Sequence, residues 1–123
     1  MNRQALMQFI EEQYGAAAEY LWAKYPTYAA FRRHDNKKWF ALVMDVPRSK
    51  LGMKGEGAID ILDVKCDPIA IGSLRQEPGF YPAYHMNKAS WVTAVLDGTV
   101  GEEKLKWLLD VSYALAGGKG GKR

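Results

Sequence analysis

One short stretch of the chain brings together residues that could hold an anion or move a proton. It reads YPAYHMNKASWVTAVLDG from Tyr81 to Gly98 and places His85 just before Asn87 and Lys88. A histidine, an asparagine and a lysine that lie close together can hold a phosphate or a carboxylate through charge-assisted hydrogen bonds. Two alternatives stay open: an acid–base role for His85, or a partly buried His85 beside an Asn-Lys pair that only shapes a turn.

Positive charge is concentrated in the middle of the chain. The net charge is only +3 over 123 residues, but residues 32 to 54 carry an excess of bases over Asp35 and Asp45. The bases in this segment are Arg32, Arg33, Lys37, Lys38, Arg48, Lys50 and Lys54. Aromatic residues stand among them in FRR and KKWF, and nucleic-acid-binding surfaces use cations for phosphates and rings for stacking. The distribution favours an anionic partner, with a solvated hairpin as the alternative.

Few other residues could carry chemistry. His34 and His85 are the only histidines and Cys66 is the only cysteine, so the sequence contains no zinc-binding pattern. The glycines of GMKGEG have the wrong order for a dinucleotide-binding motif, and no serine stands in a G-x-S-x-G elbow. Cys66 alternates with Leu62 and Val64, which predicts a buried and unreactive thiol. We therefore expect no catalytic residue, no metal site and no cofactor.

Local patterns predict the elements that must position these residues. Residues 3–14 have the spacing of an amphipathic helix, and residues 39–46 are apolar at both parities, as in a strand covered on both faces. Residues 58–66 form another strand, and Asp67-Pro68 starts a short helix that reaches residue 76. The last two strands are expected at 81–85 and 91–96. Thr99 and Glu102 then have the capping-box spacing that opens a final helix.

This order of elements predicts an α+β domain over residues 1–116, followed by a flexible basic tail at 117–123. Strands joined by hairpins, with helices at both ends, form a single twisted antiparallel sheet rather than a doubly wound one. We expect the N- and C-terminal helices on one face of the sheet and the short helix before the last two strands. The expected buried residues of the two terminal helices are Leu6, Phe9, Ile10, Leu105, Leu108, Leu109, Ser112 and Leu115.

Composition and hydropathy bound the location of the protein. Hydrophobic residues make up 48% of the chain and charged residues 25%, which is typical of a globular protein. No apolar run reaches the roughly 18 residues that cross a bilayer, and the N-terminus lacks the pattern of a signal peptide. The single cysteine cannot form an internal disulfide, as is usual in a reducing compartment. We expect a monomeric cytoplasmic protein with no membrane partner.

Several segments of the chain, in their order and spacing, resemble the MmcQ/YjbR family of small bacterial proteins. They are FRRHDNKKWFALVMDVPRSKLG, DILDVKCDP, PGFYPAYHMNKASW, LDG and the SY pair at 112–113, and the resemblance runs from about residue 25 to 115. It implies a CyaY/frataxin-like α+β fold described as a double wing, and DNA binding. The family pattern falls on Arg32, Asp35, Asn36, Lys37, Lys65, His85, Asn87, Lys88 and Trp91. Ser90 departs from it, because we expect a histidine there.

The charge distribution and the resemblance together predict a non-catalytic DNA-binding protein that contacts the phosphate backbone through basic wings. The wings would be the 34–38 turn or the 47–57 loop, and the 86–90 connection. The candidate contacts are Arg32, Arg33, Lys37, Lys38, Arg48, Lys50, Lys54, His85, Asn87 and Lys88.

Hypotheses from other classes of function remain open. One is a small-molecule or enzymatic pocket at His85 and Lys88, and another is a protein-interaction module. A frataxin-like metal role would need an acidic ridge on the first helix, which offers only Glu11 and Glu12.

Overall fold

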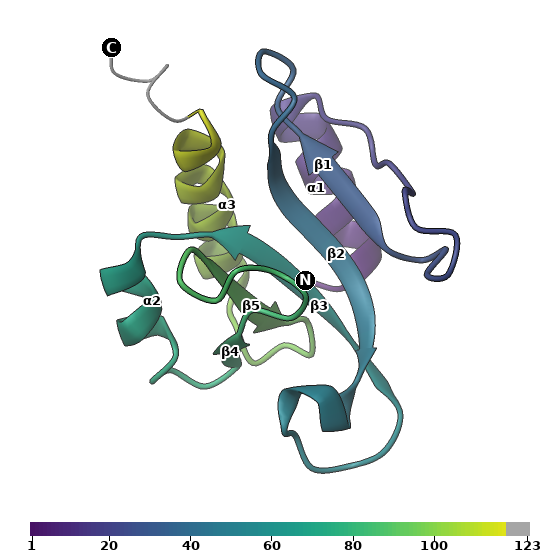
Figure 1. The fold of residues 1–123 in the computed structure, drawn as a ribbon, viewed down its shortest axis with the longest axis vertical. Coiled ribbons are helices and arrows are strands. Elements are labelled where there is room, and N and C mark those ends of the chain that lie inside the picture. Colours follow the sequence, from purple (N-terminus) through teal and green to yellow (C-terminus); the bar gives the residue numbers. More distant parts are fainter. Residues whose placement is uncertain (118–123) are drawn as a thin grey trace.

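The computed structural model describes residues 1–117 and shows an open five-stranded antiparallel sheet (Figure 1). The elements are α1 (Arg3–Tyr14), β1 (Ala29–Arg32), β2 (Trp39–Pro47), the 3-10 helix η1 (Arg48–Leu51), β3 (Ala58–Lys65), α2 (Pro68–Leu74), β4 (Phe80–Pro82), β5 (Trp91–Val95) and α3 (Glu102–Ala116). The strand order is β1-β2-β3-β5-β4. The predicted α+β class and single antiparallel sheet are confirmed. Of the predicted tail, residues 118–123 lie outside the described residues.

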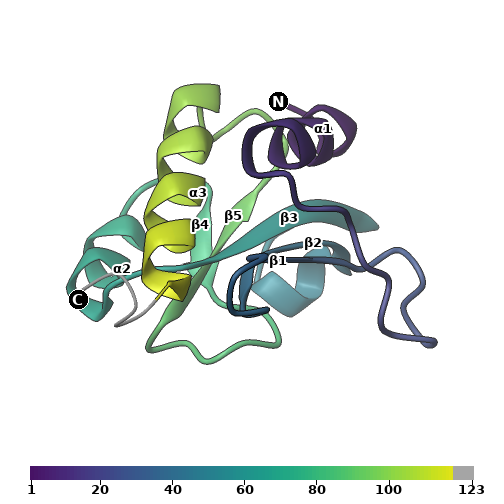
Figure 2. The same cartoon turned by 90° about the horizontal axis from the view of Figure 1, so that it is seen from above.

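Helices α1 and α3 lie on one face of the sheet (Figure 2). Leu6 and Ile10 of α1 and Leu108 of α3 are completely buried in one core together with the strand residues of that face. Phe9 packs against this core and is only partly buried. The prediction for Leu115 is wrong, since its side chain is 42% exposed. The buried residues of α3 are Leu105, Leu108, Leu109, Ser112 and Ala116, because the step after Ser112 is four residues.

The helix ends are fixed by local interactions, and one predicted cap is absent. The Asn2 side chain accepts a hydrogen bond from the Ala5 N–H at 2.8 Å, and the Asp67 side chain accepts one from the Ile69 N–H at 2.8 Å. α2 begins at Pro68 as predicted and ends earlier, at Leu74. The predicted capping box at Thr99 does not form, because the Thr99 N–H donates to the Asp97 carboxylate in the preceding turn. α3 begins at Glu102.

The opposite face of the sheet is covered by two irregular segments, residues 19–28 and 83–90. Leu42 and Met44 of β2 and Ile61 of β3 are buried in a second core that also includes residues from both segments. The strand predicted at 81–85 is shorter than expected, since β4 ends at Pro82. Beyond Pro82, the Tyr84 N–H donates to the Thr93 side chain at 3.0 Å, so the chain departs from the ladder there.

A buried serine of α3 joins β2 and β3 where their ladder stops. The last paired residues at this end are Ala41 and Val64, so Phe40 and Lys65 would pair next. The Ser112 hydroxyl lies between them: it donates to the Phe40 carbonyl at 2.6 Å and accepts from the Lys65 N–H at 2.8 Å. The two strands therefore separate at this end while their polar groups remain satisfied.

Candidate functional site

Hydrogen bonds hold the turn between β1 and β2 against the C-terminal end of α3. One of the residues that donate them is Arg33, which the sequence predicted as a phosphate contact. Arg33 donates to the Asp35 carboxylate at 2.9 and 2.7 Å and to the Tyr113 carbonyl at 2.7 Å, and its guanidinium lies 4.1 Å from the Tyr113 ring centre. The hydrogen bonds from Arg33 lower the pKa of the Asp35 carboxyl to about 2. The Asn36 amide donates to the Ala116 carbonyl at 2.8 Å. In this structure Arg33 therefore stabilises the turn.

Two more predicted contact residues organise their own loops. Arg48 donates to the carbonyls of Glu56 and Ala58 at 2.9 and 3.0 Å, which holds the 48–57 loop together. The Asn87 side chain accepts from the Ala89 N–H at 2.8 Å, as in an Asx turn. The structure thus shows Asn87 in the turn role that the sequence left open as an alternative.

Four cations surround a shallow hollow at the end of the sheet where β2 and β3 separate. Its lining residues, which we call the basic hollow, are Arg32, Lys37, Lys38, Trp39, Lys65 and Trp91. Lys65 and Trp91 are register partners on β3 and β5, and the Lys65 ammonium lies 5.9 Å from the Trp91 ring centre. Trp91 itself is almost fully buried, so it forms the floor.

The cations of the basic hollow differ in whether they already form an ion pair within the protein. Arg32 forms an ion pair with Glu19 at 3.2 Å, and its guanidinium lies 5.8 Å from the Trp39 ring centre. Lys37 and Lys38 are exposed, and neither has an ion-pair partner within residues 1–117. Exposed lysines without a carboxylate partner keep their charge available for an anionic ligand.

The basic segment of the sequence is divided in space by the length of β2. Lys37 and Lys38 precede this nine-residue strand, whereas Lys50 and Lys54 follow it in the 48–57 loop. Figure 1 shows the two ends of β2 far apart. At about 3.3 Å per residue, the two pairs stand roughly 30 Å apart along the strand. The basic residues of segment 32–54 therefore lie in two separate places on the protein. Lys65, at the last position of β3, was not part of that segment.

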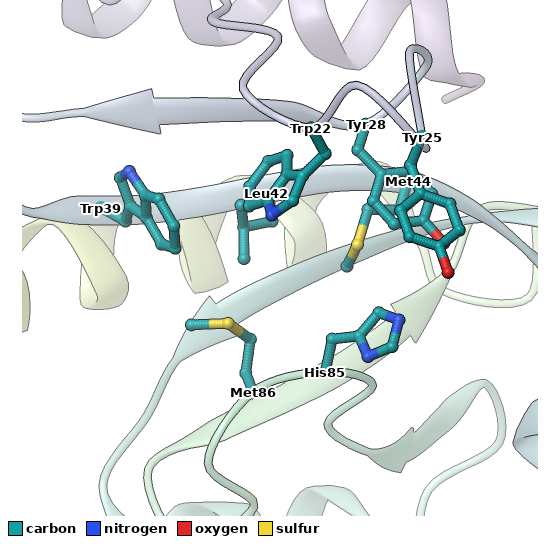
Figure 3. A pocket seen from close by; sticks show the side chains of 8 residues that line it. All are labelled: Trp22, Tyr25, Tyr28, Trp39, Leu42, Met44, His85 and Met86. Carbon is teal, nitrogen blue, oxygen red and sulfur yellow. The ribbon is translucent and has the colours of Figure 1, made fainter.

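A cavity of about 340 Å³ lies beside the basic hollow, between the two irregular segments that cover the sheet. Its lining residues, which we call the aromatic cavity, are Trp22, Tyr25, Tyr28, Trp39, Leu42, Met44, His85 and Met86. Figure 3 shows His85 and Met86 on one side and the rings of residues 22–28 and β2 on the other. The rings of Tyr25 and Tyr28 are stacked with centres 4.6 Å apart, and those of Trp22 and Trp39 are tilted at 5.5 Å.

His85 is held in an unusual backbone conformation at the edge of this cavity. Its φ of 63° lies in the left-handed region, which few residues other than glycine adopt, although asparagine, aspartate and histidine do so more often than the rest. Its ring centre lies 6.2 and 6.4 Å from those of Tyr25 and Tyr28, and 4.0 Å from that of Tyr84. Of His85, Asn87 and Lys88, only His85 lines the aromatic cavity.

A completely buried carboxyl group lies on the same face of the sheet. Asp63 of β3 is the register partner of Leu42 on β2 and Thr93 on β5. Thr93 donates its hydroxyl proton to Asp63 Oδ1 and accepts the N–H of Tyr84 at 3.0 Å, so this chain of hydrogen bonds fastens the beginning of the 83–90 segment.

The other oxygen of Asp63, Oδ2, has no hydrogen-bond partner within residues 1–117. Burial raises the pKa of Asp63 to about 7, although the bond from Thr93 and the charge of Lys88 act in the opposite direction. Aspartate is usually exposed, so no pattern in the strand predicted that Asp63 would be buried.

The described residues offer no sign of a metal site or a membrane span. Within residues 1–117, no three His, Cys, Asp or Glu side chains lie close enough together to hold a metal ion. None of the helices in this part of the chain is both long and apolar enough to span a membrane.

Comparison with known proteins identifies the family. The YjbR family model matches residues 11–115, which includes every strand of the sheet. The chain belongs to the YjbR family. YyaQ of Bacillus subtilis, an uncharacterized protein, is 40% identical over 115 residues, which are 94% of this chain and 98% of YyaQ. The resemblance seen in the sequence is thereby confirmed.

Solved structures that are similar to this chain share its fold. A crystal structure of a Pseudomonas syringae protein has a TM-score of 0.92 at 43% identity and covers 94% of this chain and 99% of its own. A solution structure from the same organism has a TM-score of 0.85 at 43% identity, over 94% and 93% of the two chains. Deinococcus radiodurans protein DR2400 has a TM-score of 0.74 at 28% identity, over 97% and 80%.

Proposed function

We propose that this protein binds DNA without catalysing a reaction. In this proposal the backbone phosphates of the DNA lie in the basic hollow. The observation that carries the proposal is the convergence of Arg32, Lys37, Lys38 and Lys65 on one hollow. These residues come from β1, the β1–β2 turn and β3, so the fold brings Lys65 to three cations that are close together in the sequence.

The expected strength of binding follows from the number of free cations. Arg32 is already paired with Glu19, so three to four phosphates at most are neutralised in the hollow. Each neutralised phosphate contributes about −0.9 to the slope of log K against log salt on duplex DNA and about −0.7 on a single strand. We therefore expect weak, salt-sensitive binding, in the range of about 10⁻⁴ to 10⁻⁶ M that is typical of nonspecific complexes.

The proposal can be tested by following backbone and indole N–H signals of ¹⁵N-labelled protein during a titration with a short DNA at low salt. The largest changes are expected at residues 32–39, Lys65 and Trp91. The 48–57 loop serves as the internal control, because Lys50 and Lys54 are exposed there at the other end of β2. Changes centred on that loop, or no change at millimolar DNA, would contradict the proposal.

A further inference from the structure

We propose that the aromatic cavity receives an unpaired base of single-stranded nucleic acid while the phosphates beside that base lie in the basic hollow. This inference rests on the proposed function and specifies its ligand. It assigns a role to the cavity between residues 22–28 and 85–86, which phosphate binding alone leaves without one.

The position of Trp39 connects the two sites. Its side chain lines both the basic hollow and the aromatic cavity. The two sites also lie on the same face of the sheet. Trp91 of the basic hollow belongs to the same core as Leu42 and Met44 of the aromatic cavity, and Lys65 is the register partner of Trp91. A ligand with a flat ring on one side of Trp39 and a phosphate on the other is therefore the chemistry that both sites share.

The lining of the cavity suits a flat ring. Trp22 and Trp39 are tilted by 57° to each other and both are only partly buried, so neither ring face is fully used by the other. Tyr25, 43% exposed, forms part of the rim. Stacking on such rings accepts any base, because every base has a π face. Methionine side chains, here Met44 and Met86, adapt to the shape of what they contact.

His85 supplies the polar side of the cavity. Its imidazole faces the rings of Tyr25 and Tyr28 across the space (Figure 3), and an imidazole can donate or accept a hydrogen bond at the edge of a base. The bond from the Tyr84 N–H to the Thr93 side chain holds the residue before His85 in place.

The dimensions of the cavity favour a single strand over a duplex. Its volume of about 340 Å³ is near the lower end of the range of about 300–1,000 Å³ for ligand sites. Bases within a duplex are stacked on both faces, and they become available to a protein pocket only when the strand is unpaired or the base is flipped out. A free nucleotide carries the same ring and phosphate, but it lacks the neighbouring phosphates that would reach the other cations of the basic hollow.

The test measures the affinity of the full chain at low salt for four probes, of which three have the same length. They are a single-stranded 12-mer DNA, the same strand with every base replaced by an abasic site, the corresponding duplex and a mononucleotide. We expect the single strand to bind at least ten-fold more tightly than the abasic strand, since stacking of one base contributes about that much. It should also bind more tightly than the mononucleotide, which keeps the base but lacks the neighbouring phosphates. The duplex is expected to behave like the abasic strand.

Three variants locate the effect in the protein. Trp22→Leu removes one wall of the cavity and should weaken binding of the single strand about ten-fold or more, with no change for the duplex or the abasic strand. Tyr25→Leu, at the exposed rim, provides the same test if the first variant unfolds. The matched control is Trp107→Leu, because Trp107 is 50% exposed on α3 and lies outside both sites. It should bind all probes as the unchanged protein does.

The possible failures can be told apart. If the single strand, the abasic strand and the duplex bind equally and the cavity variants change nothing, this inference is wrong and phosphate binding stands. A mononucleotide that binds as tightly as the strand would overturn the assignment to a strand. If none of the polyanionic probes binds, both this inference and the proposed function are wrong.

Discussion

The buried carboxyl of Asp63 predicts that the protein loses stability as the pH rises from about 4 to about 7. Its pKa is raised from 3.8 to about 7, chiefly because burial disfavours the charged form. The folded state therefore holds the proton more tightly than the unfolded chain, and above its unfolded pKa the group opposes folding progressively until its folded pKa is reached. A shift of this size corresponds to about 4 kcal/mol once the group is fully charged, a large part of the usual stability of a small domain.

The substitution Asp63→Asn isolates this effect. It keeps the shape of the side chain and the oxygen that accepts from Thr93, but it removes the titration. Between pH 4.5 and 6.5, the free energy of unfolding of the unchanged protein should fall relative to that of the variant by about 1.4 kcal/mol per pH unit.

Urea denaturation followed by circular dichroism at pH 4.5, 5.5, 6.5 and 7.5 gives both curves. The lowered pKa of Asp35, about 2, belongs to a lower window, because its contribution is lost only as the pH falls from about 4 to 2. Parallel curves for protein and variant between pH 4.5 and 6.5 would refute the assignment of a raised pKa to Asp63.

Other parts of the structure make separate predictions. Leu108→Ala should lower the free energy of unfolding by about 2–5 kcal/mol, the usual result of a large-to-small change in a core; an unchanged urea midpoint would remove Leu108 from the shared core. Ser112→Ala should lower it by about 1–3 kcal/mol, because the Phe40 carbonyl and the Lys65 N–H lose their buried partner, and hydrogen exchange at Lys65 should accelerate. Burial raises the pKa of the Cys66 thiol, so we expect slow modification by a thiol reagent in the folded protein and fast modification in urea; a fast reaction without urea would contradict a structural role.

The sequence predicted the elements that depend on local patterns. α1, β2, β3 and the start of α2 follow from periodicity and from caps such as Asp67, whose partners lie within a few residues. The strand expected at 81–85 ends at Pro82, after which the Tyr84 N–H donates to the Thr93 side chain, and the expected cap at Thr99 was lost to the Asp97 turn. In both places a side-chain oxygen accepts a nearby backbone N–H, an interaction that the predicted pattern did not include.

The candidate site was less accessible to such reasoning because long-range packing assembles it. The aromatic cavity combines Trp22, Trp39 and His85 from three segments that no spacing connects. The burial of Asp63 depends on the segment that crosses over it some twenty residues later in the chain. The basic segment was recognised, but the extended length of β2 divides it into two groups of lysines, which charge counting cannot show.

The proposed function requires that the lysines of the basic hollow, and not those of the 48–57 loop, bind phosphates. The most direct measurement is the slope of log K against log salt for a 12-mer DNA, for the unchanged protein and two double variants. Lys37→Gln with Lys38→Gln should flatten the slope by about 1.4 on a single strand and 1.8 on a duplex, since each phosphate contact contributes about 0.7 or 0.9. Lys50→Gln with Lys54→Gln removes the same charge and should leave the slope unchanged. Equal flattening by both pairs would show that binding follows net charge alone and would contradict the account.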